Sequence, residues 1–74
     1  MPVEVVQAAK AYQYNIWLLE AATAVSPGVK NAQVALDRVT KLDAARGQLT
    51  EGQRTAVLQY RMQAYLLEIG RAHV

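Results

Sequence analysis

The stretch AYQYNIWLLEAATAVSPG, residues 11–28, decides the fold because it joins a nearly uncharged segment to a strong turn signal. Residues 11–25 contain one charged side chain, Glu20, and are otherwise dominated by aliphatic, aromatic and alanine residues. Ser26 can cap a following helix by accepting a backbone N–H, and Pro27 fits the first helical position, where no N–H is needed. We therefore predict one helix that ends at Val25 and a second that begins at Pro27.

The rest of the chain consists of similar helix-forming segments separated by short turns. Ala, Leu, Gln, Glu, Lys and Arg dominate between the turns, and β-branched residues are scattered rather than alternating, so strands are not expected. Gly47 can adopt the left-handed conformation that ends a helix, and Thr50 with Gln53 forms a capping box that opens the next one. The predicted helices span residues 2–25, 27–46 and 50–71.

These segments predict an all-α fold, a three-helix antiparallel bundle in one domain over residues 1–74. Two long outer helices enclose one shorter amphipathic middle helix, because short turns favour antiparallel neighbours. A chain of 74 residues lies near the lower size limit for a self-sufficient core. Burial of further apolar surface against another chain would therefore stabilise the fold, and we expect the protein to oligomerise.

The composition excludes several classes of site. There is no cysteine, so disulfides and thiolate metal sites are ruled out, and the single histidine, His73, cannot build a metal site alone. We expect no metal and no cofactor. The N-terminus lacks the features of a signal peptide, and Lys10, Gln13, Asn15 and Glu20 interrupt the most apolar stretch, so no membrane span is expected. We expect a cytoplasmic protein of the small type common in bacteria and phages.

The middle helix is predicted to be buried on one side only. At 100° per residue its apolar residues fall within one arc, while its charged and amide residues fall outside it, which is typical of a surface helix. Asp37 and Lys41 can form an i,i+4 ion pair on the polar side. The apolar arc contains Val29, Ala32, Ala35, Leu36, Val39 and Leu42.

Each outer helix carries two apolar seams, and only one of them can face the core of a three-helix unit. We assign to the core the seams with four–three spacing: Val5, Ala9, Tyr12, Ile16 and Leu19 in the first helix, and Leu58, Met62, Tyr65 and Ile69 in the third. The second seams are expected to face solvent and to bind another chain. The predicted interface residues are Tyr14, Trp17, Leu18, Val25, Tyr60, Ala64 and Leu67.

The outer helices thus have more apolar surface than one three-helix unit can bury. This surplus favours a non-enzymatic protein–protein interaction module. Such a module self-associates or covers a hydrophobic partner, as an assembly subunit, an adaptor or a small inhibitor does. The alternative is a plain monomer whose second seams belong to a broad core. Catalysis is not expected: there is no glycine-rich phosphate loop, Ser26 is the only serine and has a capping role, and Glu20 fits a solvated polar stripe.

Nucleic-acid binding is the competing function. The segment LTEGQRTAVLQY, residues 49–60, resembles the opening of a helix-turn-helix domain, but a reading helix does not follow, because one long helix continues to the chain end. Basic residues around the second turn could contact phosphates, namely Arg38, Lys41, Arg46 and Arg54. A net charge of +2 with interleaved acidic residues is a weak electrostatic signal for such binding.

Overall fold

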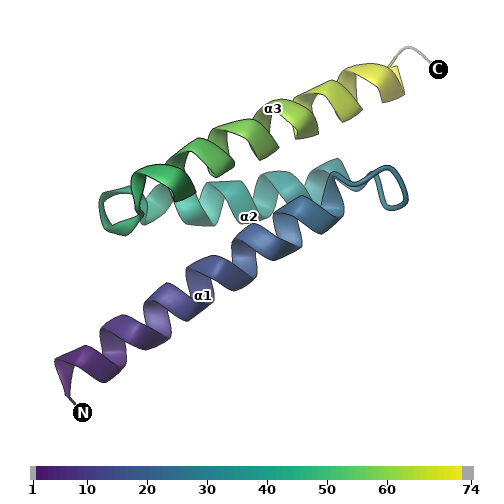
Figure 1. The fold of residues 1–74 in the computed structure, drawn as a ribbon. Helices are drawn as coiled ribbons and strands as arrows, with labels where there is room; N and C mark the ends of the chain where they lie inside the picture. Colours follow the sequence, from purple (N-terminus) through teal and green to yellow (C-terminus); the bar gives the residue numbers. More distant parts are fainter. Residues whose placement is uncertain (1, 73–74) are drawn as a thin grey trace.

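The computed structural model describes residues 2–72, which form three α-helices and a short 3-10 turn. The helices are α1 (Val3–Ala24), α2 (Ala32–Ala44) and α3 (Glu51–Ala72), with η1 (Arg46–Gln48) before α3. No strand occurs among the described residues, so the all-α, three-helix prediction is confirmed. Consecutive helices reverse direction, and the molecule is elongated, with extents of 51 × 19 × 16 Å (Figure 1).

The turn between α1 and α2 differs from its prediction. The Ser26 hydroxyl donates to the Thr23 carbonyl at 2.7 Å instead of capping the next helix. Residues 27–29 form a single turn, and Lys30 stops it with a left-handed backbone, φ 49°. Asn31 is the true cap of α2, since its side chain accepts the N–H of Val34 at 3.2 Å. The middle helix therefore begins at Ala32, five residues later than predicted.

The turn between α2 and α3 was predicted in part. The capping box is confirmed: Thr50 N–H donates to Gln53 Oε1 at 2.8 Å, and Gln53 N–H donates to Thr50 Oγ1 at 3.1 Å. The prediction for Gly47 is wrong, because no glycine of the described chain has a positive φ. Gly47 lies inside η1, which tightens the chain after α2 has already ended at Ala44.

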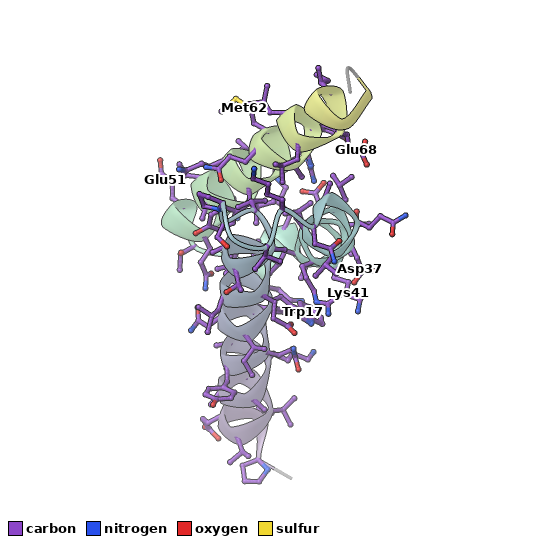
Figure 2. The ribbon with its side chains drawn as sticks, turned by 90° about the vertical axis from the view of Figure 1, so that its right-hand side faces the viewer. Trp17, Asp37, Lys41, Glu51, Met62 and Glu68 are labelled. Atoms are coloured by element: carbon purple, nitrogen blue, oxygen red, sulfur yellow. The ribbon has the colours of Figure 1, made fainter. Side chains whose placement is uncertain are left out.

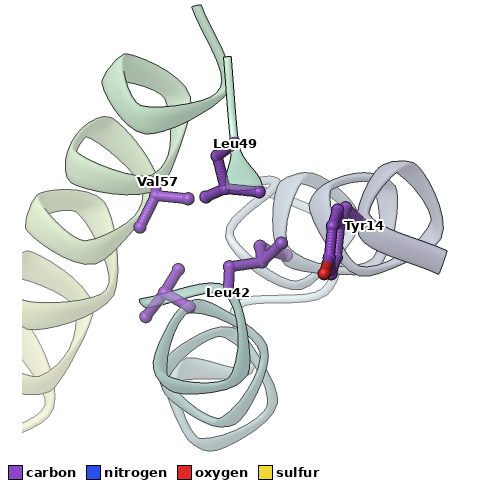
Figure 3. Packing of buried hydrophobic residues seen from close by; sticks show 6 residues of the cluster. Tyr14, Leu42, Leu49 and Val57 are labelled. Atoms are coloured by element: carbon purple, nitrogen blue, oxygen red, sulfur yellow. The ribbon is translucent and has the colours of Figure 1, made fainter. Parts of the chain in front are cut away.

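The core consists of two clusters centred on α2. The larger one contains Val39 and Leu42, the largest fully buried side chains, and draws residues from all three helices and from the second turn (Figure 3). Its buried members are Tyr14, Ala21, Val39, Leu42, Leu49 and Val57. The smaller cluster consists of three alanines, Ala24, Ala35 and Ala64, one from each helix. Alanine side chains are small, which lets neighbouring helices approach closely at this contact.

The middle helix is too short to cover its neighbours. It has 13 residues, whereas α1 and α3 have 22 each, and at 1.5 Å per residue this is about 20 Å against about 33 Å. The N-terminal half of α1 and the last turns of α3 consequently project from opposite ends of the molecule (Figure 1). All side chains from Pro2 to Tyr12 are exposed.

Candidate interaction surface

A row of apolar side chains runs along the outer face of α1, opposite the side that packs on α2 and α3. We call it the α1 stripe; Tyr12 and Leu19 are its most exposed members, at 70% and 68%. Only Ile16 is partly buried. The residues follow one another at intervals of four and three, the spacing of a coiled-coil seam. The α1 stripe consists of Val5, Ala9, Tyr12, Ile16 and Leu19.

A second row lies on the outer face of α3 and is called the α3 stripe. Its four members, Leu58, Met62, Tyr65 and Ile69, are each at least half exposed, and Leu66 beside them is 59% exposed. Met62 points away from α3 on the side opposite α2 (Figure 2). The intervals are again four, three and four. Each terminal helix therefore presents a heptad-spaced apolar face to solvent.

The side chains predicted to form the interface lie on the inner faces instead. Tyr14 and Ala64 are buried, at 8% and 0% exposure. The other predicted interface residues are partly buried: Trp17, Leu18 and Tyr60 pack against the larger cluster, Val25 packs against the smaller one, and Leu67 is also partly buried. The expectation that this seam faces solvent is therefore wrong, and the two seams are exchanged. The surplus of apolar surface itself is present, but on the other seam.

The reason for this exchange is the size of the residues on the inner faces. Ala21, Ala35 and Ala64 have no exposed surface, and larger side chains at these positions would hold the helices apart. The inner seams combine these alanines with large residues, namely Trp17, Leu18 and Tyr60, that pack against the larger cluster. Alanines where the helices meet thus allow the close packing typical of protein interiors.

Polar contacts at the edges of the inner faces also hold α1 and α3 in the orientation that buries these faces. The Arg38 guanidinium of α2 donates to the Glu20 carboxylate of α1 at 3.1 Å, and Arg61 of α3 donates to Asp43 of α2 at 2.6 Å. The Tyr14 hydroxyl, at the inner edge of α1, donates to the side-chain oxygen of Gln48. Rotating α1 or α3 to bury its stripe would break these contacts.

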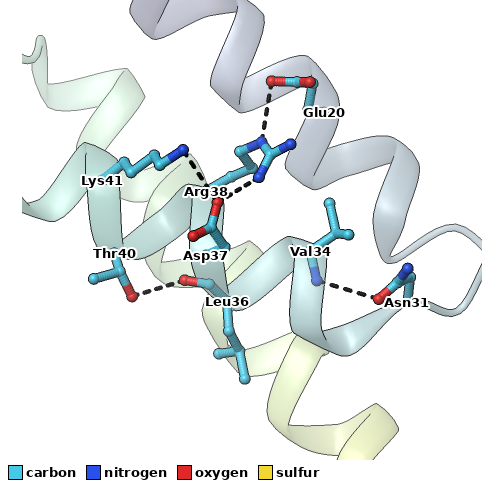
Figure 4. Close-up of polar contacts among 8 residues, drawn as sticks. All are labelled: Glu20, Asn31, Val34, Leu36, Asp37, Arg38, Thr40 and Lys41. Carbon is cyan, nitrogen blue, oxygen red and sulfur yellow. Dashed lines mark hydrogen bonds and ion pairs between the residues drawn. The ribbon is translucent and has the colours of Figure 1, made fainter.

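The polar side of α2 carries a small network of ion pairs (Figure 4). Asp37 accepts from Arg38 and lies 3.4 Å from the Lys41 ammonium. The hydrogen bond from Arg38, followed by Lys41, holds the pKa of Asp37 below its ordinary value, although desolvation opposes this. Hydrogen bonds to Glu20 and then Asp37 raise the pKa of Arg38. Lys41 also lies 5.7 Å from the centre of the Trp17 ring.

These contacts occupy most of the basic residues proposed to bind nucleic acid. Arg38 and Lys41 are each paired with carboxylates, as described above. Arg54 donates its Nε–H to the Arg46 carbonyl at 3.0 Å, so it stabilises the turn that leads into α3. Arg46 is exposed. The four residues therefore do not form one unneutralised basic face.

The structure also locates the residues considered for chemistry. Ser26 and Glu20 are hydrogen-bonded to Thr23 and Arg38, and His73 lies outside the described residues. Within residues 2–72, no three histidine, cysteine, aspartate or glutamate side chains gather where a metal ion could bind. None of the helices described combines the length and the apolarity needed to cross a lipid bilayer.

Comparison of the chain with protein-family models, with curated proteins and with solved structures finds no match.

Proposed function

We propose that this chain is a non-enzymatic interaction module that self-associates through the α1 and α3 stripes. The observation that carries the proposal is the exposure of two heptad-spaced rows of large apolar side chains on a chain of 74 residues. Contiguous exposed apolar patches of a few hundred Å² mark interaction surfaces in soluble proteins. Aromatic residues, which both stripes contain, and Met, which the α3 stripe contains, are enriched in such surfaces.

A second copy of the chain is the partner that best fits these stripes. Heptad-spaced apolar rows pair with rows of the same kind on another helix, and this chain supplies two of them. Neither stripe contains a charged residue, so like-charge repulsion does not oppose contact between copies. Association through the α1 stripe would also cover the N-terminal half of α1, where the side chains from Val3 to Tyr12 are exposed.

The test is the molar mass of the protein at low micromolar concentration, measured by light scattering behind a sizing column. We expect a dimer or larger assembly, which Leu19→Glu or Met62→Glu weakens while the helix content by circular dichroism is kept. Gln33→Glu is the matched control, because Gln33 is exposed on α2 and lies outside both stripes.

A wild-type chain that is monomeric and binds no hydrophobic dye would overturn the proposal. A monomer that does bind the dye would instead indicate that the stripes cover a different protein.

Nucleic-acid binding is the weaker proposal, because the ion pairs of Arg38 and Lys41 reduce the free positive charge. Electrostatic binding is strongest at low salt. Titration of labelled duplex in about 50 mM salt tests it, and an absence of binding there would eliminate it.

A further inference from the structure

We infer that the α3 stripes of two copies pair in antiparallel orientation across a twofold axis between Met62 and Tyr65. This inference rests on the proposed self-association and adds its partner helix and direction. Three observations support it: the spacing of the stripe, the charges along its edge, and the area that it exposes.

The spacing of the stripe matches an antiparallel pair of identical helices. If Met62 of one copy packs against Tyr65 of the other, Leu58 and Ile69 are brought together one turn further along at each end. All four layers then combine two large apolar side chains, each at least half exposed in the single chain. The stripe is therefore complementary to its own reversed copy, as a twofold interface requires.

The charges along the edge of the stripe favour the antiparallel direction. Arg61 and Glu68 lie seven residues apart on the same flank of α3, so reversing one helix places Arg61 of each copy beside Glu68 of the other. In a parallel pair, Arg61 would instead face the position of Leu66. Arg61 binds Asp43 through one nitrogen, and its guanidinium has further donors for a second carboxylate. Edge pairs of this kind select orientation more than they add affinity.

The exposed area is sufficient for a specific contact. The five exposed side chains, Leu66 included, each offer roughly 100 Å², since large side chains bury about 150–250 Å² when fully covered. Two copies would then bury on the order of 1,000 Å² in total, which reaches the minimum expected of a specific interface and is typical of a weak or transient one. The α1 stripe stays available to enlarge the contact or to bind a further copy.

Engineered cysteines can test the direction, because the chain has no cysteine of its own. Leu58→Cys and Ile69→Cys are prepared separately, and one of them is labelled with nitrogen-15 so that the mixed disulfide differs in mass from the two like disulfides. Each variant is oxidised alone and in an equal mixture with the other. In the antiparallel pair, Cys at 58 of one copy meets Cys at 69 of the other, within the ~7 Å that a disulfide allows. Two copies of position 58 lie about 16 Å apart and cannot be joined.

In the mixture, we expect the disulfide between position 58 and position 69 to make up more than half of the linked product, the share that random collision gives. Each variant oxidised alone should form little disulfide-linked dimer. Gln33→Cys, exposed on α2, reports random collision, and circular dichroism checks that each variant folds. Efficient disulfides within each single variant would show a parallel pair and overturn the inference. Dimers that form no stripe disulfide would also overturn it while leaving self-association intact. A monomeric wild-type chain would overturn both proposals.

Discussion

The middle helix and the outer helices differ in how much of their apolar surface is buried. The apolar residues of α2 centre on Val39 and Leu42, which are fully buried, and its polar side is occupied by ion pairs. The outer helices α1 and α3 carry apolar residues on both faces: the inner faces pack alanines together with large residues such as Trp17, Leu18 and Tyr60, whereas the outer faces leave the two stripes exposed. This contrast shows that α2 has one apolar face, which the core covers, whereas α1 and α3 each have a second apolar face that the core leaves exposed.

The largest expected loss of stability comes from a cavity in α2, and it tests this contrast directly. Leu42→Ala removes a fully buried side chain and should lower the free energy of unfolding by about 3 kcal/mol. Leu19→Ala, which removes the same atoms from the α1 stripe, should change the stability of the single chain by less than about 0.5 kcal/mol. Urea denaturation followed by circular dichroism, repeated at two protein concentrations, separates folding from association. Equal losses for the two variants would contradict the assignment of inner and outer faces.

An intermediate effect is expected where the three alanines meet. Ala64→Leu adds bulk at a site with no exposed surface, packed against Ala24 and Ala35. We expect a loss of about 2 kcal/mol from overpacking, measured by the same urea titration. Ala44→Leu serves as the control, because Ala44 is exposed near the end of α2. If Ala64→Leu stabilises the chain, then the narrow contact does not determine which seam is buried.

The smallest effect concerns the ion pairs on the polar side of α2. The pKa of Asp37 is lowered from 3.8 by its hydrogen bond with Arg38 and by Lys41. A depressed folded-state pKa adds stability above the unfolded pKa, and this stability is lost as pH falls through the folded value. Stability should therefore decline slightly below about pH 4, and Asp37→Asn should remove that part of the decline. An unchanged pH profile in thermal denaturation of Asp37→Asn would show that the pair contributes nothing.

Much of the fold was predictable because it depends on local signals. The capping box of Thr50 and Gln53 and the good helix formers between the turns predict the number of helices and the start of α3. The start of α2 was not predictable in the same way, because Ser26 and Asn31 are both good caps. The choice between them depends on the left-handed backbone of Lys30, where glycine or asparagine is the usual residue.

The orientation of the outer helices was harder to predict because each has two plausible apolar seams. The helical wheel shows both seams, and the one expected in the core was the wrong one. Two signals in the sequence pointed to the other: the alanines at 21, 35 and 64, and the opposite charges that border the inner seam, Glu20 with Arg38 and Asp43 with Arg61. Each signal requires residues from two helices to be considered together, whereas a helical wheel treats each helix separately.

The position of Trp17 has a practical consequence. It is the only tryptophan, its ring centre lies 6.2 Å from that of Tyr14, and it packs against the larger cluster where α1 meets α2. Its emission should therefore shift to longer wavelength when the chain unfolds and stay constant when copies separate, because the α1 stripe lies on the other side of the helix. The protein thus carries an intrinsic fluorophore that distinguishes denaturation from dissociation without any added label.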